Sequence, residues 1–141
     1  MSVYYYKNVY CPWSSKDIQK VFNLAARMEK SIKGDVEINI ISEEEIKKMN
    51  SDWRGINKPT DVLSFAWQEE KRVPTTNLGQ IYLCYSYIVK QAAVYHVSVE
   101  EEFARTLIHG ILHLVGYDHQ EKKAANKMFT LQQEIMNKYG A

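Results

Sequence analysis

The feature of this sequence that most constrains its fold is the eleven-residue segment HGILHLVGYDH, in which three histidines recur around two glycines. His109 and His113 are four residues apart, so on an α-helix their rings lie about 6 Å apart along the axis and on one face. Gly116 follows three residues later and can adopt the left-handed conformation that ends a helix. The chain then turns back, which brings His119 towards the same point.

These three histidines predict a metal site. Three neutral imidazoles with one open position are the arrangement that catalytic zinc uses, because bound water then has a pKa of about 7 instead of about 15.7. For His109 or His113 alone, hydrogen bonding within the protein would be the simpler explanation. The helical pair, the glycine and the third histidine together favour one Zn²⁺ ion bound by His109, His113 and His119. His96 has no such partners, and we expect it at a helix end near the C-terminal dipole.

Hydrophobic periodicity predicts the remaining elements. The alternation of Val36, Ile38 and Ile40 with polar residues is typical of a half-buried strand, and capping-box pairs begin helices at Ser42 and Ser98. Polar connections are expected over residues 50–60 and 69–77. The expected strands are residues 3–6, 36–40, 62–65 and 81–84, and the expected helices are residues 14–30, 42–49, 86–96, 98–115 and 121–139. This order predicts an α+β fold with a mixed sheet of about four strands packed by about five helices, and a zincin-like metal site on a helix in the C-terminal half.

Length and composition favour one ordinary domain over residues 1–141, since 141 residues with 45% hydrophobic content can form one core. Lysine and arginine number 18 against 17 acidic residues, so the net charge of +1 gives no overall field for nucleic acid. Cys11 and Cys84 lack metal or redox spacing, and the N-terminus lacks a secretory signal pattern. We therefore expect a cytoplasmic protein with buried, unbridged thiols. The longest apolar stretch, residues 108–115, is too short to cross a membrane.

The histidine segment resembles the signature of the YbeY family, bacterial endoribonucleases associated with ribosomal-RNA maturation and ribosome quality control. A second stretch, RGINKPTDVLSF at residues 54–65, resembles the family's other motif. The two motifs stand in the family's order, and the resemblance covers nearly the whole chain. Asn57, Ala66 and Gln80 stand where the family usually has aspartate, proline and aspartate, which puts a supporting role of those aspartates in doubt here.

The resemblance implies a zinc-dependent hydrolase that cleaves single-stranded RNA, with ribosomal RNA and the ribosome or its proteins as partners and with no membrane or DNA partner. It also implies that Arg54 lines the cleft beside the metal as a catalytic residue. A guanidinium there can contact two phosphate oxygens and stabilise the charge that grows in the transition state.

Each of three further residues has two possible roles. Lys58 is either a point charge for phosphate or a surface lysine on a turn. Arg105 lies one turn before His109 and could reach substrate, but we favour a helix arginine that is either solvated or paired with Glu101 or Glu102. Asp118 either orients an imidazole or bonds its own backbone in a turn.

Two other functions compete with RNA cleavage. The histidine spacing matches the metzincin peptidases, but these need a glutamate directly after the first histidine, where this chain has Gly110. Without that base, peptide hydrolysis loses roughly 10²–10⁴-fold in rate. The second rival is a ribosome-assembly or RNA-binding factor whose metal only stabilises the fold. A fourth protein ligand, such as a carboxylate or Cys84, would favour that reading, whereas an open position facing Arg54 would favour catalysis.

Overall fold

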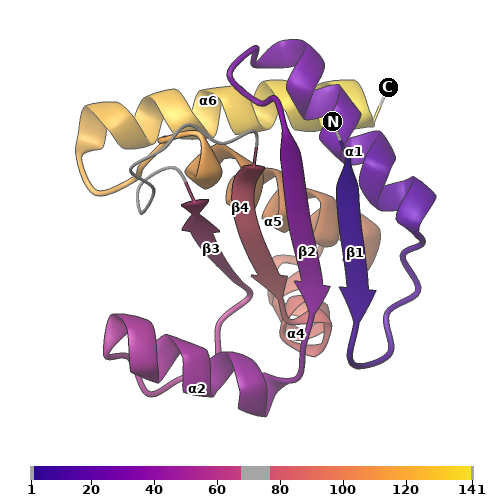
Figure 1. The fold of residues 1–141 in the computed structure, drawn as a ribbon, viewed down its shortest axis with the longest axis vertical. Coiled ribbons are helices and arrows are strands. Elements are labelled where there is room, and N and C mark those ends of the chain that lie inside the picture. Colours follow the sequence, from indigo (N-terminus) through magenta and orange to yellow (C-terminus); the bar gives the residue numbers. More distant parts are fainter. Residues whose placement is uncertain (1, 68–76, 141) are drawn as a thin grey trace.

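A computed structural model describes residues 2–67 and 77–140 and contains one four-stranded mixed sheet (Figure 1). The strands are β1 (Val3–Lys7), β2 (Asp35–Ile40), β3 (Val62–Ala66) and β4 (Asn77–Leu83). Their order in the sheet is β1-β2-β4-β3. β1, β2 and β4 run parallel, whereas β3 is antiparallel to β4 and forms an edge of the sheet.

Five helices complete the described part of the chain: α1 (Ser15–Met28), α2 (Glu43–Arg54), α4 (Tyr85–Tyr95), α5 (Val99–Leu114) and α6 (Lys122–Tyr139). The predicted α+β class, with a mixed sheet of about four strands and about five helices, is confirmed. Ser42 caps α2 in a reciprocal capping box with Glu45, as its spacing predicts. The Ser98 hydroxyl accepts a hydrogen bond from the Glu101 amide at the start of α5.

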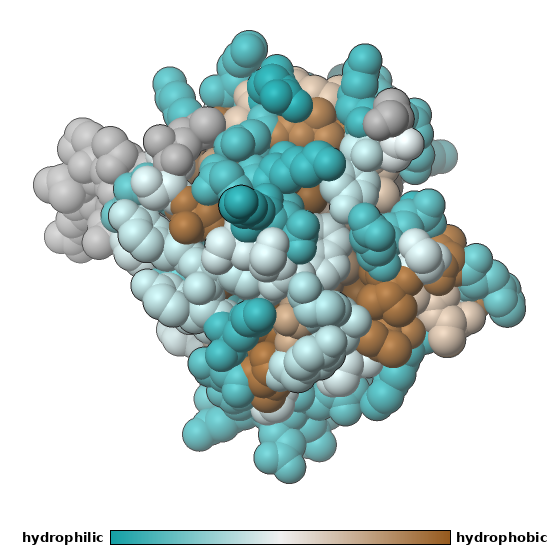
Figure 2. Space-filling model, turned by 90° about the vertical axis from the view of Figure 1, so that its right-hand side faces the viewer, coloured by the Kyte–Doolittle hydropathy of each residue, from teal (hydrophilic) through white to brown (hydrophobic). Residues whose placement is uncertain are grey.

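The helix that carries two of the site histidines, α5, lies at the centre of the main core. Its apolar residues pack between the sheet and the surrounding helices α1, α4 and α6. Phe103, Leu107 and Ile111 are fully buried there. Figure 2, which looks onto the side that carries α1 and β1, shows hydrophobic side chains only in separate patches among hydrophilic ones. α5 has more buried residues than the other described helices, so packing in the main core fixes its position.

A glycine brings β3 and β4 into close contact. Gly79 has φ of 151°, and a Cβ atom at this position would overlap the carbonyl oxygen of Phe65 on the paired strand. Only glycine combines this backbone conformation with so close an approach. Gly79 therefore helps to hold the edge strand β3 in place.

Helix α2 is longer than the sequence predicts. The expected helix ends near Met49 and the expected loop covers residues 50–60, but the helix continues to Arg54. Two features extend it: Asn50 is buried and donates to the Lys58 carbonyl oxygen at 2.8 Å, and Gly55 caps the helix with φ of 70°. Arg54 is therefore the last residue of a helix and does not lie in a loop.

A second, smaller core joins α2 to the sheet and is formed by Ile41, Ile46, Leu63 and Cys84. Figure 1 shows α2 beyond the end of the sheet, beside β3. Cys84 here and Cys11 in the main core are both buried and free, as expected. β4 begins at Asn77, earlier than the predicted residue 81, and the rest of the expected polar connection, residues 69–76, lies outside the described residues. In the described ranges, no helix combines the length and apolar content needed to cross a membrane.

Candidate metal centre

The three predicted site histidines lie together. His109 and His113 are one turn apart on α5, and their Nε2 atoms are 3.2 Å apart. The ring of His119 lies 5.6 Å from that of His109 and 5.2 Å from that of His113, measured between ring centroids. One ring nitrogen from each histidine lies within 4.8 Å of the others. In a tetrahedral zinc site such nitrogens are about 3.4 Å apart, so the three rings lie close to the spacing that a shared ion requires.

The turn that carries His119 follows the predicted helix end. α5 ends at Leu114, and Gly116 has φ of 97°, in the left-handed region. The amide of Gly116 donates to the His113 carbonyl oxygen at 3.2 Å, and that of Tyr117 donates to the Leu112 carbonyl oxygen at 3.1 Å. These bonds satisfy the last carbonyl groups of α5 and direct the chain back towards the histidines.

Tyr117 also ties this turn to α1. Its hydroxyl donates a 2.5 Å hydrogen bond to Oε2 of Glu29, the residue that caps the end of α1. This bond raises the pKa of Tyr117 to about 12 and lowers the pKa of Glu29. The turn with His119 is therefore attached to two helices, and the sequence alone gives no sign of this contact.

The environment of the α5 histidines favours their neutral forms. Burial lowers the pKa of His109, and burial together with the neighbouring His109 and His119 lowers the pKa of His113 to about 4. A metal ion binds the neutral imidazole, so neither ring needs to lose a proton near neutral pH to act as a ligand.

Gln132 on α6 orients one of these rings. The side chain is only 8% exposed, and its Oε1 atom accepts a hydrogen bond from the Nδ1 atom of His109 at 2.8 Å. The Nε2 atom of His109, which faces His113, is then free of a proton and available as a ligand. Sequence reasoning missed Gln132. One feature of the sequence could have indicated its role: Gln132 is a polar residue on the apolar side of the last helix, beside Met128, Ile135 and Met136.

The sheet approaches α5 closely beside the histidines. The Ser64 hydroxyl on β3 donates to the Gly110 carbonyl oxygen at 3.0 Å. A Cβ atom on Gly110 would lie 3.1 Å from the Ser64 Oγ atom, 3.1 Å from Val62 and 3.2 Å from Ile81. The position that holds the general base in metzincins is thus packed against the sheet, and a glutamate there would have to displace β3. This observation argues against a function as a metzincin-like peptidase.

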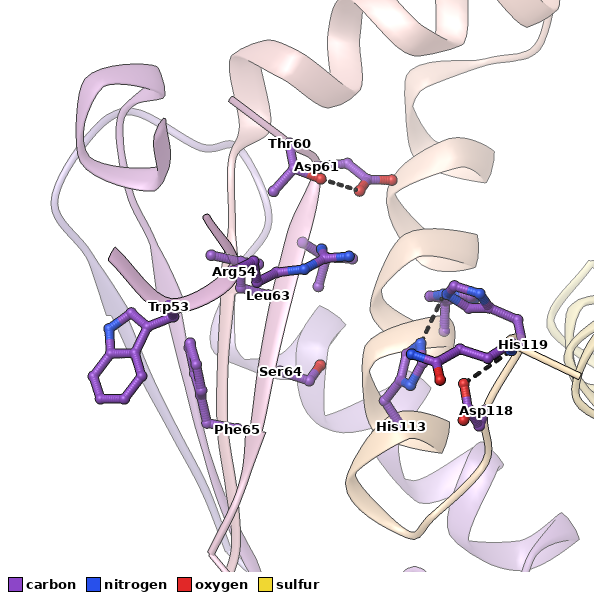
Figure 3. Close-up of a pocket in the computed structure, with 13 residues that line it drawn as sticks. Trp53, Arg54, Thr60, Asp61, Leu63, Ser64, Phe65, His113, Asp118 and His119 are labelled. Atoms are coloured by element: carbon purple, nitrogen blue, oxygen red, sulfur yellow. Dashed lines mark hydrogen bonds between the residues drawn. The ribbon is translucent and has the colours of Figure 1, made fainter. Parts of the chain in front are cut away.

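A cleft of about 520 Å³ separates the histidines from Arg54. β3 lies between the two ends of the cleft, and Trp53 and Arg54, at the end of α2, line the end opposite to the histidines. Figure 3 shows Arg54 extending into the cleft, with His113 and His119 across from it. The structure therefore brings Arg54 and the three histidines to one cavity, although α2 and α5 are far apart in the sequence.

The other candidate residues have more ordinary roles. Lys58 is exposed and does not line the cleft, so the structure gives no support to Lys58 as a positive charge for the phosphate. Asp118 lines the cleft, but its Oδ1 atom accepts a hydrogen bond from the Gln120 amide at 3.0 Å. This bond matches the expected role of Asp118 as a turn residue that bonds the nearby backbone. Gln80 donates to Glu37 at 3.1 Å, and His96 caps α4 in the left-handed conformation.

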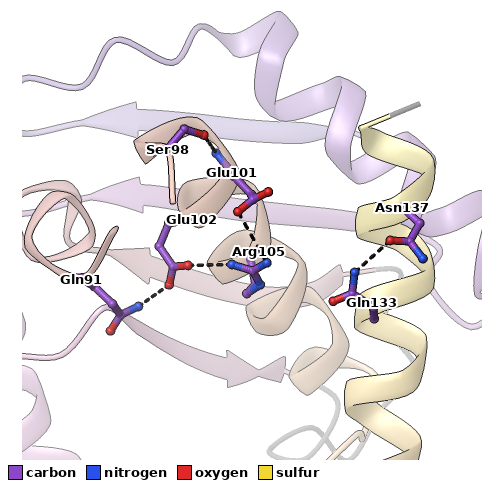
Figure 4. A network of polar contacts seen from close by, with 7 residues as sticks. All are labelled: Gln91, Ser98, Glu101, Glu102, Arg105, Gln133 and Asn137. Atoms are coloured by element: carbon purple, nitrogen blue, oxygen red, sulfur yellow. Dashed lines mark hydrogen bonds and ion pairs between the residues drawn. The ribbon is translucent and has the colours of Figure 1, made fainter. Parts of the chain in front are cut away.

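Arg105 is ion-paired, which is one of the two roles expected for it besides substrate binding. It lies 2.8 Å from Glu102 and 3.9 Å from Glu101 (Figure 4). Glu102 is 3% exposed and also accepts from Gln91 at 2.6 Å. The same Gln91 amide donates to Asp61 at 3.0 Å, so this network fixes a carboxylate in the cleft wall. The contacts of Gln91 with Glu102 and Asp61 join segments that are distant in the sequence, so spacing alone could not predict them.

The donor set suits a divalent cation such as zinc. Among the residues that the structure describes, the metal-binding group comprises the three histidines, and no carboxylate or thiolate joins them. Cys84, the fourth ligand considered from the sequence, belongs to the small core beside α2. Three imidazoles without a fourth protein ligand are typical of catalytic zinc sites rather than structural ones.

Comparison with known proteins identifies close relatives. A family model described as "Endoribonuclease YbeY" matches residues 8–140. The protein of that name from Halalkalibacterium halodurans is 40% identical over 134 residues, which cover 87% of this chain and 84% of the relative. The one from Buchnera aphidicola is 39% identical over 132 residues, which cover 90% and 85%.

A solved structure has the same fold. The solution structure of TM1509 from Thermotoga maritima matches this chain with a TM-score of 0.63 at 31% identity. The match covers 95% of this chain and 86% of that protein. The overall fold thus occurs in an experimentally determined relative.

Proposed function

The chain belongs to the YbeY family of endoribonucleases, and on this premise we propose that it is a zinc-dependent hydrolase of single-stranded RNA that acts in ribosomal-RNA maturation and ribosome quality control. Family membership supports hydrolysis of RNA. The choice of zinc, of ribosomal RNA as substrate and of the ribosome or its proteins as cytoplasmic partners is our proposal.

The observation that carries the proposal is the cleft with three converging imidazoles at one end and Arg54 at the other. We assign His109, His113 and His119 as the metal ligands. When bound, the cation supplies Lewis-acid activation of water and of the phosphodiester group. Gln132 keeps the His109 ring in the tautomer that ligation requires, and the turn fixed by Tyr117 presents His119.

Arg54 contributes the second charge of the site. Cleavage of a phosphodiester builds negative charge on the non-bridging oxygens, and a guanidinium can donate to two of them at once. Because Arg54 lies across the cleft from the histidines, it can bind the phosphate without competing for the metal. A glutamate base is less necessary than in a peptidase, since phosphate oxygens of the substrate can accept a proton.

The shape of the cleft supports a single-stranded substrate. Its volume of about 520 Å³ falls in the usual range of pockets for small molecules. Such a cavity admits nucleotides of one strand rather than a duplex, and unpaired RNA is the form whose bases proteins can separate and bind.

The test is incubation of the purified protein with a short single-stranded RNA, with and without chelator and then with added zinc. Wild type should cleave only with metal. Arg54→Ala should keep its metal content and fold but lose cleavage about 10²–10³-fold, as for removal of one transition-state donor. Arg27→Ala, which removes an arginine on α1 away from the cleft, is the matched control. Equal cleavage by Arg54→Ala would refute the role of Arg54, and cleavage by metal-depleted protein would refute metal dependence.

The same experiment addresses the second candidate, an RNA-binding assembly factor without catalysis. The net charge of only +1 favours it, because nucleases with many phosphate contacts are usually more basic. RNA binding by the zinc-loaded wild type without any cleavage would support this alternative over hydrolysis.

A further inference from the structure

Trp53 is a large aromatic residue that the fold leaves open to solvent. Its side chain is 68% exposed, although tryptophan is among the most buried residue types on average. It directly precedes Arg54 in the last turn of α2 and lines the same cleft. The packing of α2 uses Ile46 and Asn50 instead, so the core does not require the Trp53 ring.

A second aromatic residue supports the ring of Trp53. Phe65 on β3 meets Trp53 edge to face, with ring centroids 5.6 Å apart and an interplanar angle of 62°. Phe65 is itself half-buried and contacts Tyr82 at 6.0 Å in the same manner. This contact orients the Trp53 ring and leaves much of its surface accessible. Figure 3 shows the Trp53 and Phe65 rings together, on the side of the cleft away from the histidines.

The charges around this aromatic pair suit an anionic polymer with flat bases. Arg54, the residue after Trp53, is positively charged and lines the cleft, whereas Asp52, the residue before Trp53, does not line it. Of the carboxylates in the cleft wall, Asp61 is held by Thr60 and Gln91, and Asp118 lies at the histidine end. Neither belongs to the aromatic end of the cleft.

We propose that Trp53, backed by Phe65, is a stacking platform for one unpaired base of the RNA whose phosphate Arg54 binds. This inference rests on the proposed function and deepens it. A base can stack on Trp53 only if it has left its neighbours, so the platform selects single strands over duplexes. Stacking reads the face of the base rather than its edge, so the platform contributes affinity with little sequence preference.

The test measures RNA affinity and cleavage separately. Binding of a labelled single-stranded RNA to metal-depleted protein is followed by fluorescence anisotropy, and KM and kcat are measured with zinc. Trp53→Ala should weaken binding and raise KM by roughly 5- to 150-fold with little change in kcat, whereas Trp53→Phe should retain most of the affinity. Tyr95→Ala removes another exposed aromatic ring, on α4 and outside the cleft, and should bind as wild type does.

A set of RNAs, each with one abasic nucleotide at a different position, locates the stacked base. Wild type should lose affinity for the RNA that is abasic at one position, and Trp53→Ala should be insensitive to that change. Equal affinity of Trp53→Ala and wild type would overturn this inference while leaving hydrolysis intact. A loss that is the same at every abasic position would also overturn it. If wild type binds RNA through Trp53 without cutting it, the inference stands and the proposed hydrolysis fails.

Discussion

The Nδ1 atom of His109 lies 2.8 Å from the Oε1 atom of the buried Gln132. A side chain of α6 is thus hydrogen-bonded to a candidate metal ligand on α5, at the ring nitrogen that does not face His113. An amide oxygen only accepts hydrogen bonds, which requires the proton of His109 to be on Nδ1. The opposite nitrogen then faces His113. Packing of α6 on α5 thus determines which atom of His109 is offered to a metal.

Replacement of Gln132 should weaken metal binding. Gln132→Leu removes the acceptor, and we expect zinc affinity to fall about 10- to 100-fold, as for other outer partners of metal-bound histidines. Gln132→Glu keeps an acceptor and should bind zinc at least as tightly as wild type. Competition with a chromophoric chelator measures both. Gln133→Leu, on the exposed side of the same helix, is the control; an equal loss in that variant would contradict the role of Gln132.

Removal of the Tyr117 hydroxyl should loosen the turn that carries His119. Tyr117→Phe deletes the hydrogen bond to Glu29, and we expect a smaller loss of zinc affinity, about 3- to 10-fold, because the backbone bonds of the turn remain. Tyr139→Phe deletes a similar bond to Glu100 away from the histidines and should leave zinc affinity unchanged. The prediction is wrong if the two variants bind zinc equally, as titration calorimetry would show.

The stability of the metal-free protein should depend on pH through His113. An unfolded histidine titrates near pH 6.5, whereas the folded pKa of His113 is about 4. Between these values the unfolded chain binds a proton that the folded chain does not, so stability should fall as pH drops from about 6.5 to about 4. Urea unfolding at pH 7 and pH 5 should show a smaller difference for His113→Gln than for wild type. His96→Asn, at an exposed position that needs a left-handed residue, should behave as wild type; an unchanged difference in His113→Gln would exclude this explanation.

Gly79→Ala should destabilise the fold. The new methyl group would overlap the Phe65 carbonyl oxygen and force β3 away from β4. We expect a loss of about 3 kcal/mol or more in the free energy of unfolding, since strain at φ of 151° adds to the overlap. Gly140→Ala, where the nearest atom would be 3.6 Å away, should be nearly neutral. Thermal unfolding of both variants checks the comparison, and similar midpoints would contradict it.

Local sequence rules predicted the parts of the structure that local rules control. The alternation around Ile38 gave β2, and the spacing of His109, His113 and Gly116 gave both the end of α5 and the convergence of the rings. Each of these depends on backbone geometry within a few residues. The resemblance of residues 54–65 to a family motif indicated Arg54, which lines the cleft.

The parts that depend on contacts between distant segments were not predicted. α2 extends past Met49 into the expected polar connection of residues 50–60, because Asn50 is buried and bonded to the Lys58 backbone. Gln132 lies 23 residues from His109, and its role depends on how α6 packs. The edge position of β3 likewise follows from the strand order, which residue periodicity does not encode.

The small core around Ile46 has a consequence for the order in which the parts of the molecule unfold. α2 is anchored mainly by that cluster, whereas α5 is buried in the main core, so backbone amides of α2 should exchange with deuterium through local opening and those of α5 only through global unfolding. In moderate denaturant, Arg54 and Trp53 would then detach while the histidines stayed in place. Under those conditions the protein should still bind a metal ion through the histidines but should no longer cleave RNA.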